Sequence, residues 1–528
     1  MNQIHRLNRQ QMKNSLLFPL FGLILMLSGC VQKTEQKMID NYSLPRSTPE
    51  TEGLSSEAVI QFIDAAESVR DSNIELHSFM IVRHGKVLAE GWWSPYRRGL
   101  RHTMYSVSKS FTSTAIGLAV AEGRLKLTDK VVSFFPESLP DTVSPYLAQL
   151  DVDDLLKMSV GQAREPQEMR FSDDWIKTFL AAPVQYEPGT VFLYNSAGSF
   201  MLSAILQKAT GEKLIDYLKP RLFEPLGIKD ADWEVNPQGI NVGGWGLRVK
   251  TEDMAKLGLL YLQKGKWRDH RILTEEWVNA ATSEQIKTVT GEEDPANDWA
   301  QGYGYQFWQT RNNAFRGDGA FGQFIIVLPE KDAVIVLTAN AQDMQKEINL
   351  VWKHIFPAFR ESALAEDGDA LDRLKSRLSA LRLPVHTTRT SSPVREIISG
   401  KTMAFNKNPL KISELTLRFE GDVCRMTLRQ DTATYEFRFN STSWEEGETL
   451  RHGPSLTAGS KAGLTGLPPF KVAGNYVWKD EKTLELVLRY IESPNDERFV
   501  FSFEKPAVSV EYSTSYDFYQ QKLRWTEK

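Results

Sequence analysis

The sequence has little of what several protein classes require. It contains only two cysteines, Cys30 and Cys424, and eight scattered histidines in 528 residues. It has no H-E-x-x-H motif and no paired Cys/His cluster, so we expect neither a metal nor another cofactor. Basic and acidic side chains nearly balance, 63 against 67, which argues against a nucleic-acid partner. The absence of G-x-S-x-G disfavours an α/β-hydrolase.

The longest apolar run lies at the N-terminus and resembles an export signal. Three basic residues precede the apolar segment 16–27, which is shorter than the about 20 residues needed to cross a bilayer. Leu27-Ser28-Gly29-Cys30 then resembles a bacterial lipobox. We expect a signal peptide over 1–29, lipidation of Cys30, and a membrane-anchored lipoprotein of the bacterial cell envelope, facing the periplasm or the exterior. An ordinary signal peptide with a chance cysteine is the alternative. If Cys30 is acylated, Cys424 has no disulfide partner.

Changes of pattern predict several parts after the signal peptide. These are a polar tether over 30–45, a domain of mixed helices and strands over 46–360, a helical or polar linker over 361–393, and a β-rich accessory domain over 394–528. Two hairpins, 78–90 and 323–338, flank a long helical stretch and predict one antiparallel sheet built from distant segments. In the last part, short alternating segments predict strands at 415–419, 424–428, 435–439, 483–488 and 499–503.

The segment from Met104 to Glu122 has apolar groups around much of its circumference and predicts a buried helix. Ser106 and Lys109 fit S-x-x-K, and on a helix a spacing of three places the amine beside the hydroxyl. Burial lowers the pKa of a lysine, so its amine can accept the serine proton or help a phenol to do so. A second match, 502–505, lies in a strand pattern, where these positions face opposite ways. We therefore predict Ser106 as the nucleophile and Lys109 as its activator.

Further blocks carry a family resemblance. They are Met80–Lys86, Tyr105–Ser113, Asp154–Ser159, Glu187–Ser196, Gly246–Arg248, Asp253–Ala255 and Trp267–Trp277. In this order they resemble the β-lactamase-related serine hydrolases. That family includes class C β-lactamases, D-alanyl-D-alanine carboxypeptidases, family VIII esterases and 6-aminohexanoate-dimer hydrolases, and the similarity is greatest to the last branch. The resemblance covers about 46–358 and implies an α+β, β-lactamase/transpeptidase-like sandwich of an antiparallel sheet and a helical region, followed here by the β-rich C-terminal domain.

The resemblance also assigns the second motif. Tyr194 corresponds to the tyrosine that acts as general base and as proton donor to the leaving group, with a pKa that nearby Lys109 would lower. The family pattern is Tyr-x-Asn, whereas this chain has Tyr194-Asn195-Ser196. Either Asn195 or Ser196 would therefore bind the substrate.

The third motif corresponds to Gly319-Ala320-Phe321-Gly322-Gln323. The resemblance implies an oxyanion hole formed by the backbone N–H groups of Ser106 and Gln323, with Phe321 and Gly322 beside the substrate. Ala320 stands where penicillin-recognising relatives carry a cation, which argues against potent β-lactamase activity. Arg248 or Arg316 would be the replacement cation.

We thus expect a serine hydrolase that attacks an ester or amide bond through a Ser106 acyl-enzyme. Its partners would be a small-molecule or peptide-like substrate and, through lipidated Cys30, a membrane. Two alternatives stay open: a non-catalytic binding or sensor protein of the same fold, and a D-Ala-D-Ala carboxypeptidase or β-lactamase. His84 and His102 are expected in turns or at the surface. The sequence leaves the oligomeric state open.

Overall fold

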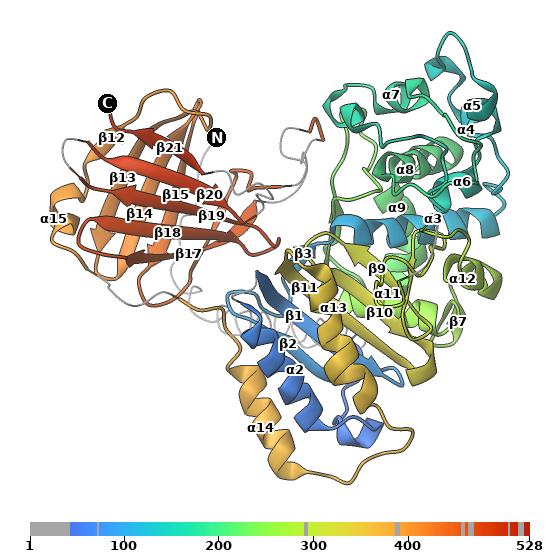
Figure 1. Ribbon diagram of the computed structural model, residues 1–528, viewed down its shortest axis with the longest axis horizontal. Coiled ribbons are helices and arrows are strands. Elements are labelled where there is room, and N and C mark those ends of the chain that lie inside the picture. Colours follow the sequence, from blue (N-terminus) through green and yellow to red (C-terminus); the bar gives the residue numbers. More distant parts are fainter. Residues whose placement is uncertain are drawn as a thin grey trace, which may run out of the picture. The chain divides into compact units, whose positions relative to one another are not determined.

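The computed structural model describes residues 43–70, 73–289, 294–385, 391–455, 460–462, 469–504, 507–515 and 522–528 (Figure 1). The expected signal peptide over 1–29, Cys30 and nearly all of the tether lie outside these ranges. From Pro45 to Lys528 the chain forms one unit. Within the described ranges, no helix has the length and apolarity that a membrane crossing requires.

An antiparallel sheet of six strands has the order β2-β1-β11-β10-β9-β8. Its strands are β1 (Ile74–Arg83), β2 (Lys86–Trp92), β8 (Trp308–Thr310), β9 (Ala314–Gly319), β10 (Gln323–Leu328) and β11 (Ala333–Ala341). Both predicted hairpins form, as β1–β2 and β10–β11. β1 also pairs with β11, so the early and the late segments share one sheet, as the hairpin positions predicted.

Helices cover both faces of this sheet. Phe79 of β1 and Ile326 of β10 belong to the apolar core that also contains residues of α2 (Ser56–Ser68). On the other face, α11 (Thr251–Leu262) comes so close that a Cβ on Gly258 would lie 2.5 Å from Val334 Cγ1. The strands β10 and β11 are therefore continuous apolar runs, because burial on both faces leaves no polar side.

The region between the two hairpins is mostly helical and centres on α3 (Ser108–Ala121). A single 3₁₀ turn, Tyr105–Val107, precedes α3 and contains Ser106, so the α-helix begins later than predicted. The other helices of this region follow α3 along the chain. They are α4 (Val131–Phe134), α5 (Pro145–Gln149), α6 (Val152–Leu156), α7 (Trp175–Ala181), α8 (Ser196–Thr210), α9 (Leu214–Leu218), α10 (Glu224–Leu226) and α12 (Glu275–Ala281). A small sheet, β3 (Arg101–Thr103), β5 (Leu247–Lys250) and β4 (Asp232–Trp233), leads into the 3₁₀ turn. β6 (Lys266–Trp267) and β7 (His270–Arg271) pair separately.

The expected linker is not a free connection. α13 (Met344–Leu350) is followed by α14 (Gly368–Ser379), where Leu374 is buried in the core shared with α2. Arg377 of α14 forms ion pairs with Asp64 and Glu67 of α2. The polar residues of α14 thus form the outer face of a packed amphipathic helix. The sequence pattern alone did not distinguish such a helix from a linker.

The C-terminal part is a second sheet of ten strands, preceded by α15 (Val394–Ile398). Its strands are β12 (Thr402–Ala404), β13 (Ile412–Glu420), β14 (Val423–Gln430), β15 (Ala433–Asn440), β16 (Glu445–Thr449), β17 (Phe470–Trp478), β18 (Thr483–Tyr490), β19 (Asp496–Ser502), β20 (Ser509–Thr514) and β21 (Leu523–Thr526). Four of the five predicted strands lie within β13, β14, β15 and β18, and the fifth, 499–503, overlaps β19 and extends one residue past its end. Burial alternates along β13 and β14, as expected for a sheet with one apolar face. Cys424 is a free, buried cysteine of this core.

Candidate active site

Ser106 and Lys109 meet as the S-x-x-K spacing predicted. Lys109 Nζ lies 2.9 Å from Ser106 Oγ, 3.2 Å from Ser196 Oγ and 2.7 Å from the carbonyl oxygen of Gly244. Lys109 is almost completely buried, whereas Ser106 is partly exposed. Three oxygen atoms therefore surround the amine, and the nucleophile candidate can still be reached from solvent.

Burial lowers the pKa of Lys109 from its usual 10.5 to about 7, although Glu165 and Asp318 oppose this shift. A large fraction of the amine is therefore neutral at physiological pH. A neutral amine can donate to Gly244 O and Ser196 Oγ while its lone pair accepts the hydrogen of Ser106 Oγ. This arrangement lets Lys109 serve as a general base toward Ser106.

Tyr194 lies beside the same pair, but its electrostatics differ from the prediction. The Lys109 amine is 4.9 Å from the centre of the Tyr194 ring. Burial raises the pKa of the Tyr194 phenol far above its usual value, and a hydrogen bond with Ser106 offsets only part of this rise. The expectation of a lowered pKa was wrong, because burial, with the charges of Asp318 and Glu165, outweighs the Ser106 hydrogen bond and the charge of Arg316. Tyr194 is thus a protonated hydrogen-bond donor.

The two residues after Tyr194 have different places. Asn195 is fully buried and caps α8, where its Oδ1 accepts from the N–H groups of Ala197 and Gly198. Its Nδ2 donates to Gln162 Oε1 at 2.8 Å, so both ends of the side chain are in use. Ser196 instead turns its hydroxyl toward Lys109. The candidate Asn195 is therefore corrected to a helix cap, and Ser196 is the residue of this motif that faces the reacting groups.

The third motif approaches Ser106 through β9. At Gly319, the last residue of β9, a Cβ would lie only 2.3 Å from the carbonyl oxygen of Met104. Gln323 is fully buried, and its side-chain Nε2 donates to Ala320 O at 3.0 Å and to Ala339 O at 2.9 Å. Because an oxyanion-hole N–H must face a space open to substrate, this burial does not support Gln323 in that role. Ala320, which is partly exposed in the turn after Gly319, is better placed.

Phe321 and Gly322 are also buried. The Phe321 ring packs edge-on against Tyr105, with centroids 5.5 Å apart. Gly322 has φ 84°, and a Cβ there would lie 1.7 Å from Oε2 of Glu347. This glycine therefore makes room for a buried carboxyl group from α13, not for substrate as predicted. The sequence analysis missed Glu347, because only the fold brings α13 beneath this turn.

Neither arginine that was expected to replace the missing cation is available. Arg316 is fully buried and pairs with Asp318, its neighbour on the same face of β9, at 3.0 Å. Arg248 is held by Asp232 at 2.6 Å and by Glu492 at 3.2 Å. Both guanidinium groups are already neutralised by carboxylates, so the alternative that they bind a substrate carboxylate is not supported.

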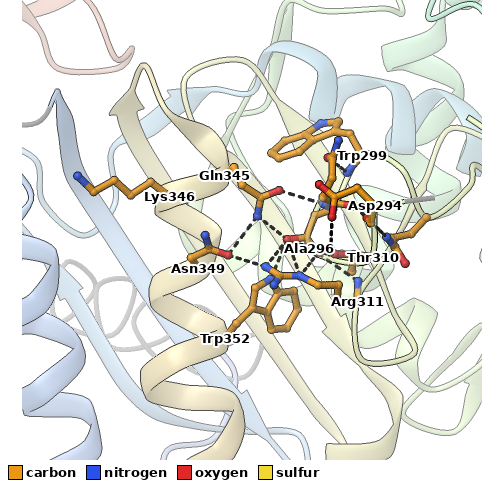
Figure 2. A network of polar contacts seen from close by, with 12 residues as sticks. Asp294, Ala296, Trp299, Thr310, Arg311, Gln345, Lys346, Asn349 and Trp352 are labelled. Atoms are coloured by element: carbon orange, nitrogen blue, oxygen red, sulfur yellow. Dashed lines mark hydrogen bonds and ion pairs between the residues drawn. The ribbon is translucent and has the colours of Figure 1, made fainter. Parts of the chain in front are cut away.

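A polar network holds Arg316 in place. Its Nη1 donates to the carbonyl oxygen of Asp298 at 2.9 Å. The Asp298 carboxylate accepts from Arg311 at 2.8 Å, from Gln345 at 2.7 Å and from Trp352 at 3.0 Å (Figure 2). Burial alone would raise the pKa of Asp298, but these donors hold it well below its usual value. The network ties the β8–β9 hairpin to α13 and thereby stabilises the strand that reaches Ser106.

Aromatic side chains surround Tyr194. Its ring stacks on Trp308 with centroids 5.5 Å apart and meets Tyr303 edge-on at 6.3 Å. Phe192 packs against both of these residues. Tyr303 and Trp308 thus form the apolar support of Tyr194.

Other expectations have mixed outcomes. His84 lies in the β1–β2 turn as expected, with φ 49°. His102 was expected in a turn or at the surface but is buried on β3, where its Nε2 is 3.2 Å from Nδ1 of His77. Glu165 was missed: its Oε1 accepts from the N–H of Ser196 at 3.1 Å, and a lone acid in a loop offered no signal.

One group of carboxylates in the described ranges is close enough to share a cation: Asp151, Asp153 and Asp154. Asp151 and Asp154 form the capping box of α6. Asp153 accepts from Lys157 and from Tyr305, each at 2.5 Å. These carboxylates already have partners within the protein, and no role in the reaction of Ser106 is assigned to them.

Comparison with known proteins now identifies the family. The sequence model of the β-lactamase family matches residues 66–356. This chain belongs to the β-lactamase family. As the sequence predicted, it is therefore a serine hydrolase of the amidase and esterase type, with a β-lactamase/transpeptidase-like α+β fold and a β-rich C-terminal sheet.

Individual relatives are distant. A 6-aminohexanoate-dimer hydrolase of Paenarthrobacter ureafaciens is 28% identical over 286 residues, covering 50% of this chain and 73% of the relative. A β-lactamase of Escherichia coli (strain K12) is 22% identical over 296 residues, covering 44% and 74%. Among solved structures, an octameric penicillin-binding protein homologue from Pyrococcus abyssi has 18% identity and a TM-score of 0.45, covering 88% of this chain and 99% of its own.

Proposed function

We propose that this β-lactamase-family protein hydrolyses ester or amide bonds through an acyl-enzyme on Ser106. The observation that carries this proposal is the contact of 2.9 Å between Ser106 Oγ and a lysine amine whose pKa burial lowers to about 7. A lysine that only stabilised the fold would gain nothing from being brought out of water beside a serine hydroxyl.

The reaction follows from the positions of these groups. Neutral Lys109 takes the proton of Ser106 Oγ as this oxygen bonds to the substrate carbonyl carbon. The N–H groups of Ser106 and Ala320 stabilise the oxyanion. The carbonyl–leaving-group bond then breaks, and the leaving atom receives a proton from Tyr194, which Lys109 replenishes. Water next attacks the acyl-enzyme and gives one proton to Lys109. The carboxylic acid is then released, and Ser106 Oγ receives that proton from Lys109.

The test uses two serine variants of the purified mature protein. Ser106→Ala should lower hydrolysis of p-nitrophenyl acetate by about 10³-fold or more and abolish labelling by a fluorophosphonate probe. Ser110→Ala is the matched control, because Ser110 lies one turn along and donates to the carbonyl oxygen of Gln306. Activity of Ser106→Ala within tenfold of wild type contradicts the proposal. A wild-type protein that neither turns over nor labels favours the binding or sensor alternative.

We propose further that neutral substrates are preferred over substrates with a carboxylate. Ala320 supplies no cation, and Arg248 and Arg316 are both paired with acids. A lost charge-assisted hydrogen bond costs about 1.5–3 kcal/mol, or roughly ten- to a hundredfold in kcat/KM. Neutral short-chain esters should exceed nitrocefin and D-Ala-D-Ala peptides in kcat/KM by that factor. Nitrocefin as the better wild-type substrate would favour the carboxypeptidase or β-lactamase alternative.

The chain is also proposed to be a lipoprotein of the bacterial cell envelope, anchored through Cys30. The support is the lipobox and the shortness of the apolar segment before it. Cys30→Ser should move the exported protein from the detergent phase to the aqueous phase. Equal partitioning of wild type and variant contradicts this proposal.

A further inference from the structure

The C-terminal sheet contacts the strand that leads to Ser106 at one turn. This turn, residues 491–495 between β18 and β19, lies against β3. The carbonyl oxygen of Glu492 accepts from Thr103 N at 2.9 Å and from Thr103 Oγ1 at 3.1 Å. The Glu492 side chain pairs with Arg101 of β3 at 3.0 Å and with Arg248 of β5 at 3.2 Å. One acidic residue of the second sheet thus binds two strands of the small sheet.

The small sheet in turn holds the segment around the nucleophile. Met104 N donates to the carbonyl oxygen of Leu247 at 2.9 Å, and Leu247 N donates to Ser108 Oγ at 3.2 Å. Lys109 donates to the carbonyl oxygen of Gly244, in the same loop before β5. A displacement of β3 or β5 would therefore move both Ser106 and the Gly244 carbonyl group, which orients Lys109.

The same turn also reaches the residue next to the nucleophile. Asn495 Nδ2 donates to Tyr105 Oη at 2.9 Å, and both side chains are almost completely buried. Tyr105 has φ 43°, a left-handed backbone conformation that a bulky residue adopts only when its surroundings impose it. On its other side the Tyr105 ring packs against Phe321 of the third motif. Tyr105 is thus held between the C-terminal turn and the β9–β10 turn.

We propose that Asn495 is a positioning residue of the active site, which fixes Tyr105 and through it the N–H and Oγ of Ser106. The C-terminal sheet is then a part of the catalytic apparatus and not an independent accessory domain. This inference rests on the proposed role of Ser106. It assigns to the turn 491–495 a function in the acylation step, in addition to its contribution to stability.

The experiment compares variants that lose hydrogen bonds made by the same turn; Asn495→Ala also loses the bond of 2.6 Å from Asn495 Nδ2 to the carbonyl oxygen of Pro454, which Tyr105→Phe keeps. Asn495→Ala and Tyr105→Phe both remove the Asn495–Tyr105 bond. Tyr96→Phe is the matched control, because Tyr96 Oη donates to the carbonyl oxygen of Ser493 at 3.0 Å. We expect Asn495→Ala and Tyr105→Phe each to lower kcat and the rate of fluorophosphonate labelling about tenfold, with KM within twofold. The double variant should be no less active, in kcat, than the more impaired of the two single variants. Tyr96→Phe should keep kcat within twofold.

Hydrogen exchange of the amides in 103–109 separates this inference from the proposed function. Exchange should be faster in Asn495→Ala than in Tyr96→Phe at equal overall stability, even if the wild-type protein proves inactive. An inactive wild type with this difference overturns the proposed function and leaves the positioning role standing. Equal exchange in the two variants, or an equal fall of kcat in both, overturns the positioning role. Should Asn495→Ala fail to fold, Tyr105→Phe alone decides, because it removes a single oxygen.

Discussion

The two large sheets differ in what they bury. The six-stranded sheet is covered on both faces, and beside it lie buried ionisable groups such as Lys109, Arg316, Asp318 and Glu347. In the C-terminal sheet, β13 and β14 bury one face of alternating apolar side chains and present charged residues such as Glu414 and Arg429 on the other, whereas β18 and β19 also bury ionisable groups such as Arg489 and Glu497. Buried charged groups lie beside the proposed nucleophile in the first region, whereas the exposed charges of β13 and β14 only keep a surface soluble. The turn 491–495 is the exception proposed above.

The largest expected effect that would sharpen this contrast is at Lys109. Lys109→Ala should lower kcat/KM for neutral esters by about 10³-fold or more, because it removes the proposed base of Ser106. In wild type, kcat/KM should fall about tenfold per pH unit below pH 7, since the pKa of Lys109 is lowered to about 7 and the protonated amine cannot accept a proton. Steady-state kinetics from pH 5 to 9 measures this limb. A flat profile would show that Lys109 is not the base.

The next effect concerns the core of the C-terminal sheet. Leu417 of β13 is fully buried, so Leu417→Ala should cost about 2–5 kcal/mol of unfolding free energy. Activity per folded molecule should stay within twofold, because β13 lies away from the turn 491–495. Urea unfolding and active-site titration measure the two quantities, and Arg418→Ala, at the exposed neighbour, is the control. A tenfold fall in activity per folded molecule would erase the contrast between the sheets.

A smaller effect is expected from Glu347, whose two carboxyl oxygens have no hydrogen-bond partner among the described residues. Burial, with the charge of Asp318, raises the pKa of Glu347 well above its usual value of 4.5. Folding then has no ionisation cost below pH 4.5, and the cost grows by about 1.4 kcal/mol per pH unit as pH rises toward the folded pKa. The gain in unfolding free energy from Glu347→Gln should therefore increase by at least about 1.4 kcal/mol between pH 4.5 and 8. A gain independent of pH would show that Glu347 is ionised in the fold.

The smallest effect tests the exposed face of the C-terminal sheet. Glu414 and Arg429 stand opposite each other on β13 and β14, 3.6 Å apart and about half exposed. Glu414→Gln should change the unfolding free energy by no more than about 0.5 kcal/mol, because water screens the pair. Thermal unfolding at low and high salt measures this. A loss above about 1 kcal/mol would mean that charges on this face stabilise the fold.

Local rules were enough to predict much of this protein. The spacing of Ser106 and Lys109 places one side chain over the other at the start of a helix, and the structure has them 2.9 Å apart. The hairpins at 78–90 and 323–338 and five strands of the C-terminal sheet follow from alternation and turn residues. Arg316 and Asp318 share a face of β9 because they are two positions apart, a signal that the sequence contained but that was not used.

Only the tertiary structure decided the rest, since each of those features depends on what distant segments do to solvent exposure. The pKa of Tyr194 rises because Trp308 and Tyr303 exclude water from it, an effect that no local pattern encodes. Asn195 became a helix cap, and Ser196 faced Lys109, only once α8 had been placed. Glu347 beneath Gly322 and Asn495 beside Tyr105 come from elements that are remote in sequence. Sequence spacing thus determined which residues are candidates for the reaction, and packing determined their protonation states and their orientation.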